Sequence, residues 1–266
     1  MFTKIRLKNF YSFKDVTFDL SKGTNSYKSL AVVYGENGSG KTNLMSGLGI
    51  FIDLMRTMDV RDMIEQILYD QEHPQGTGAP LRKISRQDLA QALRSSESLF
   101  NECRMIGSNE PVYLQYDFVI NAKKGSYIVE FGEDGIIHEK LEYVLEKRRG
   151  TYFDLTLDKK IINKALFKND AIKDDVTSQL RRFWGKHTVL AIVLHEMNDK
   201  SEQYFNEGLL ENFLTLLHSF FKVSCFIKNS SDPHALISGQ TKGKILLNIE
   251  EGTVKKGDVE KIIRTE

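Results

Sequence analysis

The sequence predicts an α/β fold, and two features of the chain support this prediction. The first is an apolar run, Leu30 to Tyr34 (LAVVY), that ends at Gly35 and is followed by a glycine-rich loop and a helical pattern. The second is a group of β-type stretches, separated by glycine turns, between residues 111 and 157. A strand, loop and helix in this order, together with an antiparallel meander, are typical of a domain that mixes sheet and helices.

Length and composition exclude several classes of protein. The 266 residues are 41% hydrophobic and 27% charged, which describes a globular chain and excludes a disordered or collagen-like one. Lysine and arginine number 37 against 36 acids, so the net charge of +1 gives no global attraction to nucleic acid or to a membrane. Cys103 and Cys225 are far apart, which excludes a disulfide scaffold and indicates a reducing compartment. The longest apolar run, Val189 to Leu194, is too short to span a membrane, so we expect a cytoplasmic protein.

Residues 1–69 are predicted to form the first of four regions. Apolar and polar residues alternate in Phe2 to Leu7 and again in Val16 to Leu20, which predicts two paired strands. LAVVY is apolar without alternation, the pattern of a strand buried on both faces, so we expect it in the centre of a sheet. From Lys41 onward the apolar residues recur at helical spacing, namely Leu44, Leu48, Ile52 and Met55.

Residues 70–110 are predicted to be an insertion that consists of a loop and a helix. The stretch QEHPQGTGAPLRKI, between Asp70 and Ser85, holds two of the four prolines in the chain and predicts an exposed loop. Ser85 with Asp88 three residues later resembles a capping box. The apolar spacing beyond it predicts a helix, through Leu89, Leu93, Phe100 and Cys103.

The remaining two regions are a meander and a helical part. Residues 111–157 contain the runs VYLQYDFVI, SYIVEFG and YFDLTL, which predict an antiparallel meander of about four strands. Residues 158–266 are predicted to be mainly helical, with helices over Ile172 to Met197 and Tyr204 to Phe221. Short strands are expected over Val223 to Ile227 and Ile245 to Ile249.

One motif in the sequence predicts a binding site for phosphate groups. Residues 35–42, GENGSGKT, match the phosphate-binding P-loop pattern G-x-x-x-x-G-K-[ST]. Glycines let the backbone wrap a phosphate, while the loop N–H groups and the positive end of the next helix face the anion. The predicted catalytic residue is Lys41, which would reach the β and γ phosphates, and Thr42 is the predicted ligand of Mg²⁺. We therefore expect ATP and Mg²⁺ as cofactors, bound by Gly35, Glu36, Asn37, Gly38, Ser39, Gly40, Lys41, Thr42 and Asn43.

Two stretches of the sequence also carry a family resemblance. IRLKNFYSFKD at residues 5–15 and YGENGSGKTNL at residues 34–44 resemble the N-terminal half of ABC-type ATPase heads of the SMC, RecF and OLD group. The match is closest to prokaryotic AAA-family ATP-binding proteins of the kind found in phage-defence and abortive-infection loci. The resemblance covers residues 2–157 well and the later helices more weakly. Tyr11 stands where this family commonly has a basic residue, which weakens any nucleotide contact assigned there.

The resemblance implies partners and further motifs. In that family two heads sandwich ATP, so it implies a second ATPase head, either another copy or a longer partner, that acts on an effector protein or nucleic acid and not on a membrane. It also implies a Walker B strand ending in Asp-Glu and an LSGGQ-like signature. The nearest stretches are VLAIVLHE (residues 189–196), which lacks the aspartate and is predicted as core helix, and LISGQ (residues 236–240), which is predicted as a turn.

The sequence therefore predicts an incomplete head, which hydrolyses ATP only if a partner or a missing C-terminal part supplies those motifs. Two alternatives stay open. The chain could bind nucleotide without hydrolysis, as a regulatory or interaction module. It could also be the remnant of a longer ATPase, because Asp258 to Glu266 stops within a helical pattern.

Three weaker patterns are interpreted as structural. His195-Glu196-Met197-Asn198-Asp199 is similar to the zinc-binding H-E-x-x-H motif, but an aspartate replaces the second histidine, which favours a solvated helix end. The basic clusters at Lys147 to Arg149 and Lys255 to Lys256 lack interleaved aromatics and are predicted to be turns. The apolar stripe from Phe205 to Phe221 is predicted to be core.

Overall fold

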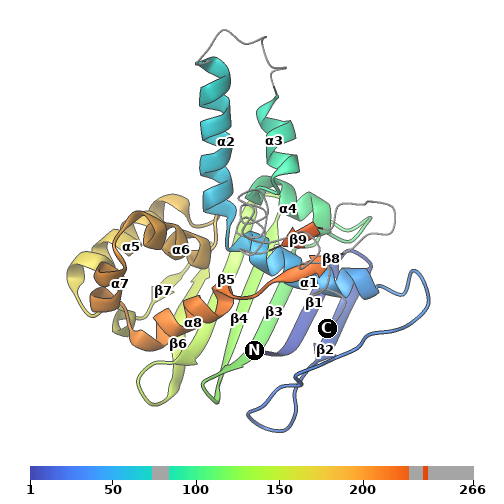
Figure 1. Ribbon diagram of the computed structural model, residues 1–266, viewed down its shortest axis with the longest axis horizontal. Helices are drawn as coiled ribbons and strands as arrows, with labels where there is room; N and C mark the ends of the chain where they lie inside the picture. The colour runs from blue at the N-terminus through green and yellow to red at the C-terminus, as the bar shows by residue number, and fades with distance from the viewer. Residues whose placement is uncertain (74–83, 228–235, 239–266) are drawn as a thin grey trace, which may run out of the picture.

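The computed structural model describes residues 1–73, 84–227 and 236–238. Its centre is a seven-stranded antiparallel sheet in the order β2-β1-β3-β4-β5-β6-β7 (Figure 1). The strands are β1 (Phe2–Phe10), β2 (Phe13–Asp19), β3 (Val112–Ile120), β4 (Lys123–Gly132), β5 (Gly135–Val144), β6 (Arg149–Thr156) and β7 (Lys160–Ile162). The mixed α/β fold class, the N-terminal strand pair and the antiparallel meander are confirmed.

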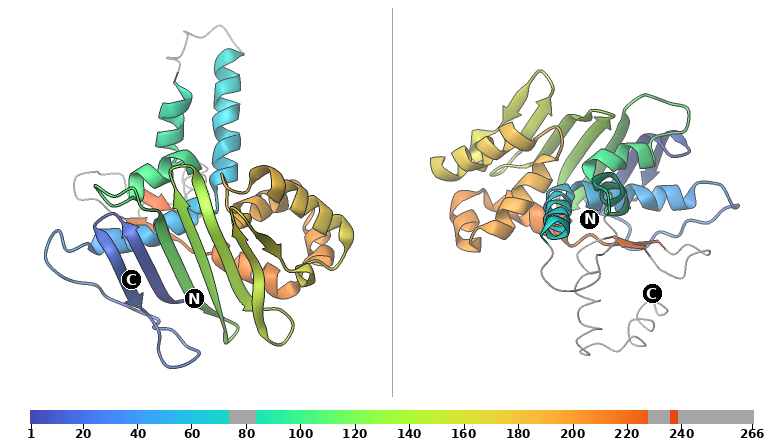
Figure 2. Two further views of the ribbon diagram at one scale, coloured as in Figure 1. Left: turned by 180° about the vertical axis from the view of Figure 1, so that it is seen from behind. Right: turned by 90° about the horizontal axis from the view of Figure 1, so that it is seen from above.

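The described part of the chain also contains eight α-helices. They are α1 (Lys41–Leu54), α2 (Thr57–Glu72), α3 (Arg86–Ala92), α4 (Ser96–Cys103), α5 (Asp170–Phe183), α6 (Val189–Asp199), α7 (Glu202–Gly208) and α8 (Glu211–Phe221). A short 3-10 turn spans Lys164–Leu166, and a separate two-stranded sheet joins β8 (Cys225–Ile227) to β9 (Leu236–Ser238). Helices α1 and α8 cover one face of the large sheet, and Figure 2 shows the opposite face without a helix over it.

The core lies between this sheet and helices α1 and α8. Phe51 of α1 packs its ring 4.7 Å from Tyr116 of β3 and 5.2 Å from Phe220 of α8. Gly47 lets α1 approach the sheet closely, because a Cβ at this position would lie 3.0 Å from the Leu7 methyls. The Tyr116 hydroxyl donates to the Gly47 carbonyl at 2.5 Å. These contacts fix the axis of the helix that carries the P-loop.

A buried carboxyl group joins the sheet to the later helices. Glu139 of β5 is fully buried and accepts from the Tyr127 hydroxyl at 2.9 Å, the Trp184 indole at 3.0 Å and the Val189 N–H at 2.8 Å. Burial raises the pKa of Glu139 to about 7, and the three donors only partly oppose this rise. The carboxyl group thereby anchors the start of α6 on the sheet.

The expected central strand at LAVVY is absent from the described fold. Residues 30–34 form no strand, and the exposed fractions are 74% for Leu30, 74% for Val32 and 91% for Tyr34. A strand needs a neighbour to satisfy its backbone groups. None of the described strands pairs with residues 30–34, since each strand of the large sheet pairs only with its neighbours in the order given above.

Other sequence predictions are refined. The helix expected over Ile172 to Met197 is two helices, separated where Gly185 has a φ of 104°. Tyr204 to Phe221 is likewise divided into α7 and α8, although its stripe is core as predicted, with Phe205, Phe213 and Phe220 buried. Helix α2 continues to Glu72 into the expected loop. The expected strand at 245–249, the lysines at 255–256 and the helical pattern at 258–266 lie outside the described residues.

Helices α2 and α3 project together from the body, and we call this pair the arm (Figures 1 and 2). Its two helices pack through a small cluster of Ile64, Leu89 and Ala90. Arg86 of α3 pairs with Glu65 of α2 at 2.6 Å. The predicted cap at Ser85 is confirmed, since its hydroxyl accepts from the Asp88 N–H. In the described part of the chain, no helix has the length and apolar character needed to cross a membrane.

Candidate functional site: the P-loop at the start of α1

The P-loop has the backbone geometry that its glycines predict. Gly38 and Gly40 have φ values of 86° and 90°, in the left-handed region that glycine adopts without strain. Gly40 is the N-cap of α1, so the helix begins at Lys41 as expected. A Cβ on Gly40 would lie 2.7 Å from the Phe13 ring, so this position also requires glycine for space.

Lys41 lies over its own loop. Its Nζ donates to the carbonyls of Gly35 and Glu36, both at 2.7 Å, and reaches the Ser39 hydroxyl at 3.5 Å. Thr42 is exposed, and its carbonyl accepts from the Ser46 hydroxyl. An ammonium group, a positive helix end and a loop without bulky side chains suit a polyphosphate.

The turn between β1 and β2 forms a wall next to this loop. The Asn43 amide donates to the Ser12 hydroxyl at 2.8 Å, which ties the first turn of α1 to this turn. The neighbouring Tyr11 has a φ of 47° and donates its hydroxyl to Glu102 of α4 at 2.9 Å. Burial, followed by the Glu102 charge, raises the pKa of Tyr11.

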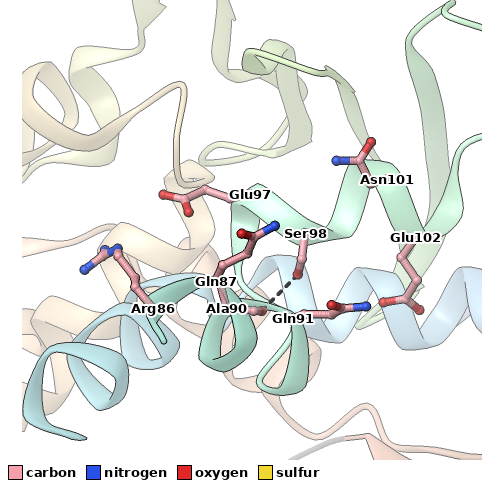
Figure 3. A pocket seen from close by; sticks show the side chains of 8 residues that line it. All are labelled: Arg86, Gln87, Ala90, Gln91, Glu97, Ser98, Asn101 and Glu102. Carbon is pink, nitrogen blue, oxygen red and sulfur yellow. Dashed lines mark hydrogen bonds between the residues drawn. The ribbon is translucent and has the colours of Figure 1, made fainter. Parts of the chain in front are cut away.

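A cavity of about 590 Å³ opens beside Asn43. It is lined by Tyr11, Ser12, Asn43, Asn101, Glu102 and the segment 104–107. A second cavity, of about 820 Å³, lies between α3 and α4 and shares Asn101 and Glu102 with the first. Figure 3 shows the second cavity, with Asn101 and Glu102 at the end of α4. Glu102 therefore lies between the surroundings of the P-loop and the base of the arm.

The sequence places the P-loop residues correctly at a helix start but misses the wall around them. Ser12, Glu102 and Arg94 carry no motif. The capping pattern at Ser85 and the apolar spacing beyond it predict one helix in this insertion, which the structure divides into α3 and α4. No group of three or more His, Cys, Asp or Glu side chains suited to a metal occurs among the described residues. The assignment of the Thr42 hydroxyl as a ligand of Mg²⁺ stays a prediction from the motif.

The Walker B lookalike belongs to helix α6, as its core-helix interpretation predicts. His195 pairs with Asp62 of α2 through Nε2 at 2.6 Å, and Glu196 pairs with Lys200 at 3.3 Å. Helix α6 lies on the β5–β7 side of the molecule, whereas the P-loop lies at the β1–β2 edge (Figure 1). In the signature lookalike, Leu236–Ser238 is strand β9 and not a turn, while residues 239–240 lie outside the described chain.

A glycine-rich loop that opens a helix, as residues 35–42 do at α1, is an arrangement suited to the phosphates of a nucleotide. The chain matches the family model of the AAA ATPase domain over residues 1–263, and it therefore belongs to that family. This membership supports a nucleotide-binding ATPase, in agreement with the ATP-binding P-loop predicted from the sequence. A search of curated proteins finds no match.

Proposed function

We propose that this chain binds MgATP as an ABC-type head and is completed for turnover by a second polypeptide. The observation that carries the proposal is the open P-loop at the start of α1, with Gly38 and Gly40 in left-handed conformations and Lys41 over the loop. ATP supplies the phosphates, and bound Mg²⁺ neutralises their charge.

Different residues around the P-loop would bind different parts of the nucleotide. Backbone N–H groups of the loop and the Lys41 ammonium would hold the phosphates, and the Thr42 hydroxyl would be a ligand of Mg²⁺. The cavity of about 590 Å³ beside Asn43 has space for a nucleoside. Three polar residues in its lining, Ser12, Asn101 and Arg104, suit hydrogen bonding to a sugar or base.

Two features support the proposal that a second polypeptide completes the site. LAVVY leads directly into the P-loop yet exposes Leu30, Val32 and Tyr34, an apolar stretch that a monomer leaves in water at a cost. In addition, no hydrogen bond or ion pair in the described chain joins a carboxylate to Lys41 or Thr42. Hydrolysis needs a group that orients the attacking water, so a second head, either another copy or a longer partner, is the source we propose.

The second candidate function is nucleotide binding without turnover. It is favoured by the same lack of a carboxylate beside the P-loop in the described residues. In either case we propose that closure around ATP acts on an effector protein or on nucleic acid, with phage defence as the biological setting that the resemblance implies.

A steady-state ATPase assay tests the proposal. We expect the chain alone to hydrolyse MgATP much more slowly than the ~1 per second of a competent enzyme. Sedimentation with and without MgATP would show a doubled mass if the partner is another copy. Turnover near 1 per second that Lys41→Ala abolishes and Lys147→Ala leaves unchanged would show that the chain is complete by itself. Lys147 is a suitable control because it is exposed in the turn between β5 and β6.

A further inference from the structure

We infer that Arg94 and Glu102 are positioning residues that couple the nucleotide site to the arm. This inference rests on the proposed ATP binding, and it adds that the position of the arm regulates this binding. No sequence motif marks either residue; a chain of direct contacts connects both of them with the P-loop helix.

Arg94 ties together both ends of the arm. It lies between α3 and α4 and has a φ of 56°, an uncommon conformation for a residue with a side chain. Its Nη1 pairs with Asp53 of α1 at 2.6 Å, just before α2 begins. Its Nε and Nη2 donate to the two oxygens of Glu102, at 2.9 and 2.6 Å. The segment before α2 and the segment after α3 therefore both contact the guanidinium group of Arg94.

The Arg94–Asp53 pair is largely shielded from solvent, whereas Glu102 lies at the surface with 36% of its side chain exposed. The side chains of Arg94 and Asp53 are only 25% and 15% exposed. Burial alone would lower the pKa of Arg94, but Asp53 and then Glu102 outweigh it and raise this pKa. A planar guanidinium that holds two carboxylates has a defined geometry, and this geometry changes if either carboxylate moves.

Glu102 extends the connection to the nucleotide site. It accepts from the Tyr11 hydroxyl at 2.9 Å, while the Tyr11 N–H donates to the Cys103 carbonyl at 2.6 Å. Tyr11 is followed by Ser12, which holds Asn43, and by Phe13, whose ring packs against Gly40. Each step from Arg94 to the first turn of α1 is thus a direct contact.

The two cavities meet at the same residue. Glu102 and Asn101 line both the cavity beside Asn43 and the cavity between α3 and α4 (Figure 3). A nucleotide that enters the first cavity changes the surroundings of Glu102, and Glu102 holds Arg94. Occupancy of the P-loop thereby alters the base of the arm, and by linkage the position of the arm alters nucleotide affinity by the same factor.

Hydrogen exchange and calorimetry on the whole chain test this coupling. Amide protection of α2 and α3 is measured with and without MgATP in the parent, Glu102→Gln, Arg94→Lys and Arg86→Gln. Arg86→Gln is the matched control, since it removes the Arg86–Glu65 pair within the arm and leaves the contacts of Arg94 intact. Arg94→Lys keeps the charge and loses the forked geometry, so it separates coupling from a general loss of folding.

We expect MgATP to change the protection of both arm helices in the parent and in Arg86→Gln. In Glu102→Gln and Arg94→Lys this change should disappear, and MgATP affinity should shift by about fivefold or more. If the parent binds MgATP without any change in the arm, or if all variants respond equally, the coupling is refuted while the proposed function stands. If the parent does not bind MgATP, both are refuted.

Discussion

Glu139 makes the stability of this protein depend on pH in a defined direction. Its pKa is raised from 4.5 to about 7 by burial, so the folded protein binds this proton more tightly than the unfolded chain does. The stabilisation is fully present below about pH 4.5 and is lost as the pH rises to about 7. A shift of this size corresponds to about 3 kcal/mol of unfolding free energy.

Glu139→Gln should remove this dependence. The amide oxygen can accept from the Trp184 indole and the Val189 N–H, and the amide NH₂ can donate to the Tyr127 oxygen, so the variant imitates the protonated acid. Between pH 4.5 and pH 7.5 the parent should lose about 3 kcal/mol of unfolding free energy that Glu139→Gln does not lose. Urea unfolding, followed through the fluorescence of the single tryptophan, measures the difference at each pH.

Glu146→Gln is the control, because Glu146 is exposed in the turn between β5 and β6 and should leave the pH profile unchanged. If the stability curves of the parent and Glu139→Gln run parallel over this pH range, the buried carboxyl group does not titrate as described and the reasoning is refuted.

Three further substitutions test the fold and the loop. Val32→Asp should change the unfolding free energy by no more than about 0.5 kcal/mol, because Val32 is 74% exposed; a loss of folding in thermal circular dichroism would contradict this. Gly40→Ala should weaken MgATP binding about tenfold or more, since it adds strain and a clash with Phe13. Equal weakening by Gly185→Ala, at a position between α5 and α6 with positive φ and open space, would contradict that explanation. Phe51→Ala should cost about 3–5 kcal/mol in urea unfolding, and a loss below about 1 kcal/mol would mean that α1 does not pack as described.

Local patterns predicted the elements that depend on local chemistry. Alternation located the strands of the meander, the glycine loop located the start of α1, and Ser85 marked the start of α3. The apolar run at 189–194 was predicted as core helix and is buried in α6, apart from the half-buried Leu194. Each of these signals lies within a few residues of the feature that it predicts.

The failures concern contacts between distant segments. LAVVY has the composition of a buried strand, but burial requires neighbouring strands, and the described sheet pairs its strands elsewhere. Beside the P-loop, Tyr11 contacts Glu102, which is 91 residues away in the sequence. Nothing in the local sequence around either residue predicts this contact. The break at Gly185 was missed because the apolar spacing continues through it.

Calorimetric titration of MgATP into the chain and into Lys41→Ala tests the central claim most directly. We predict saturable binding by the parent and a loss of about 30-fold or more in Lys41→Ala, because a charge-assisted phosphate contact contributes about 2 kcal/mol. Binding that is absent in the parent, or equally strong in both proteins, would contradict the assignment of residues 35–42 as the nucleotide site.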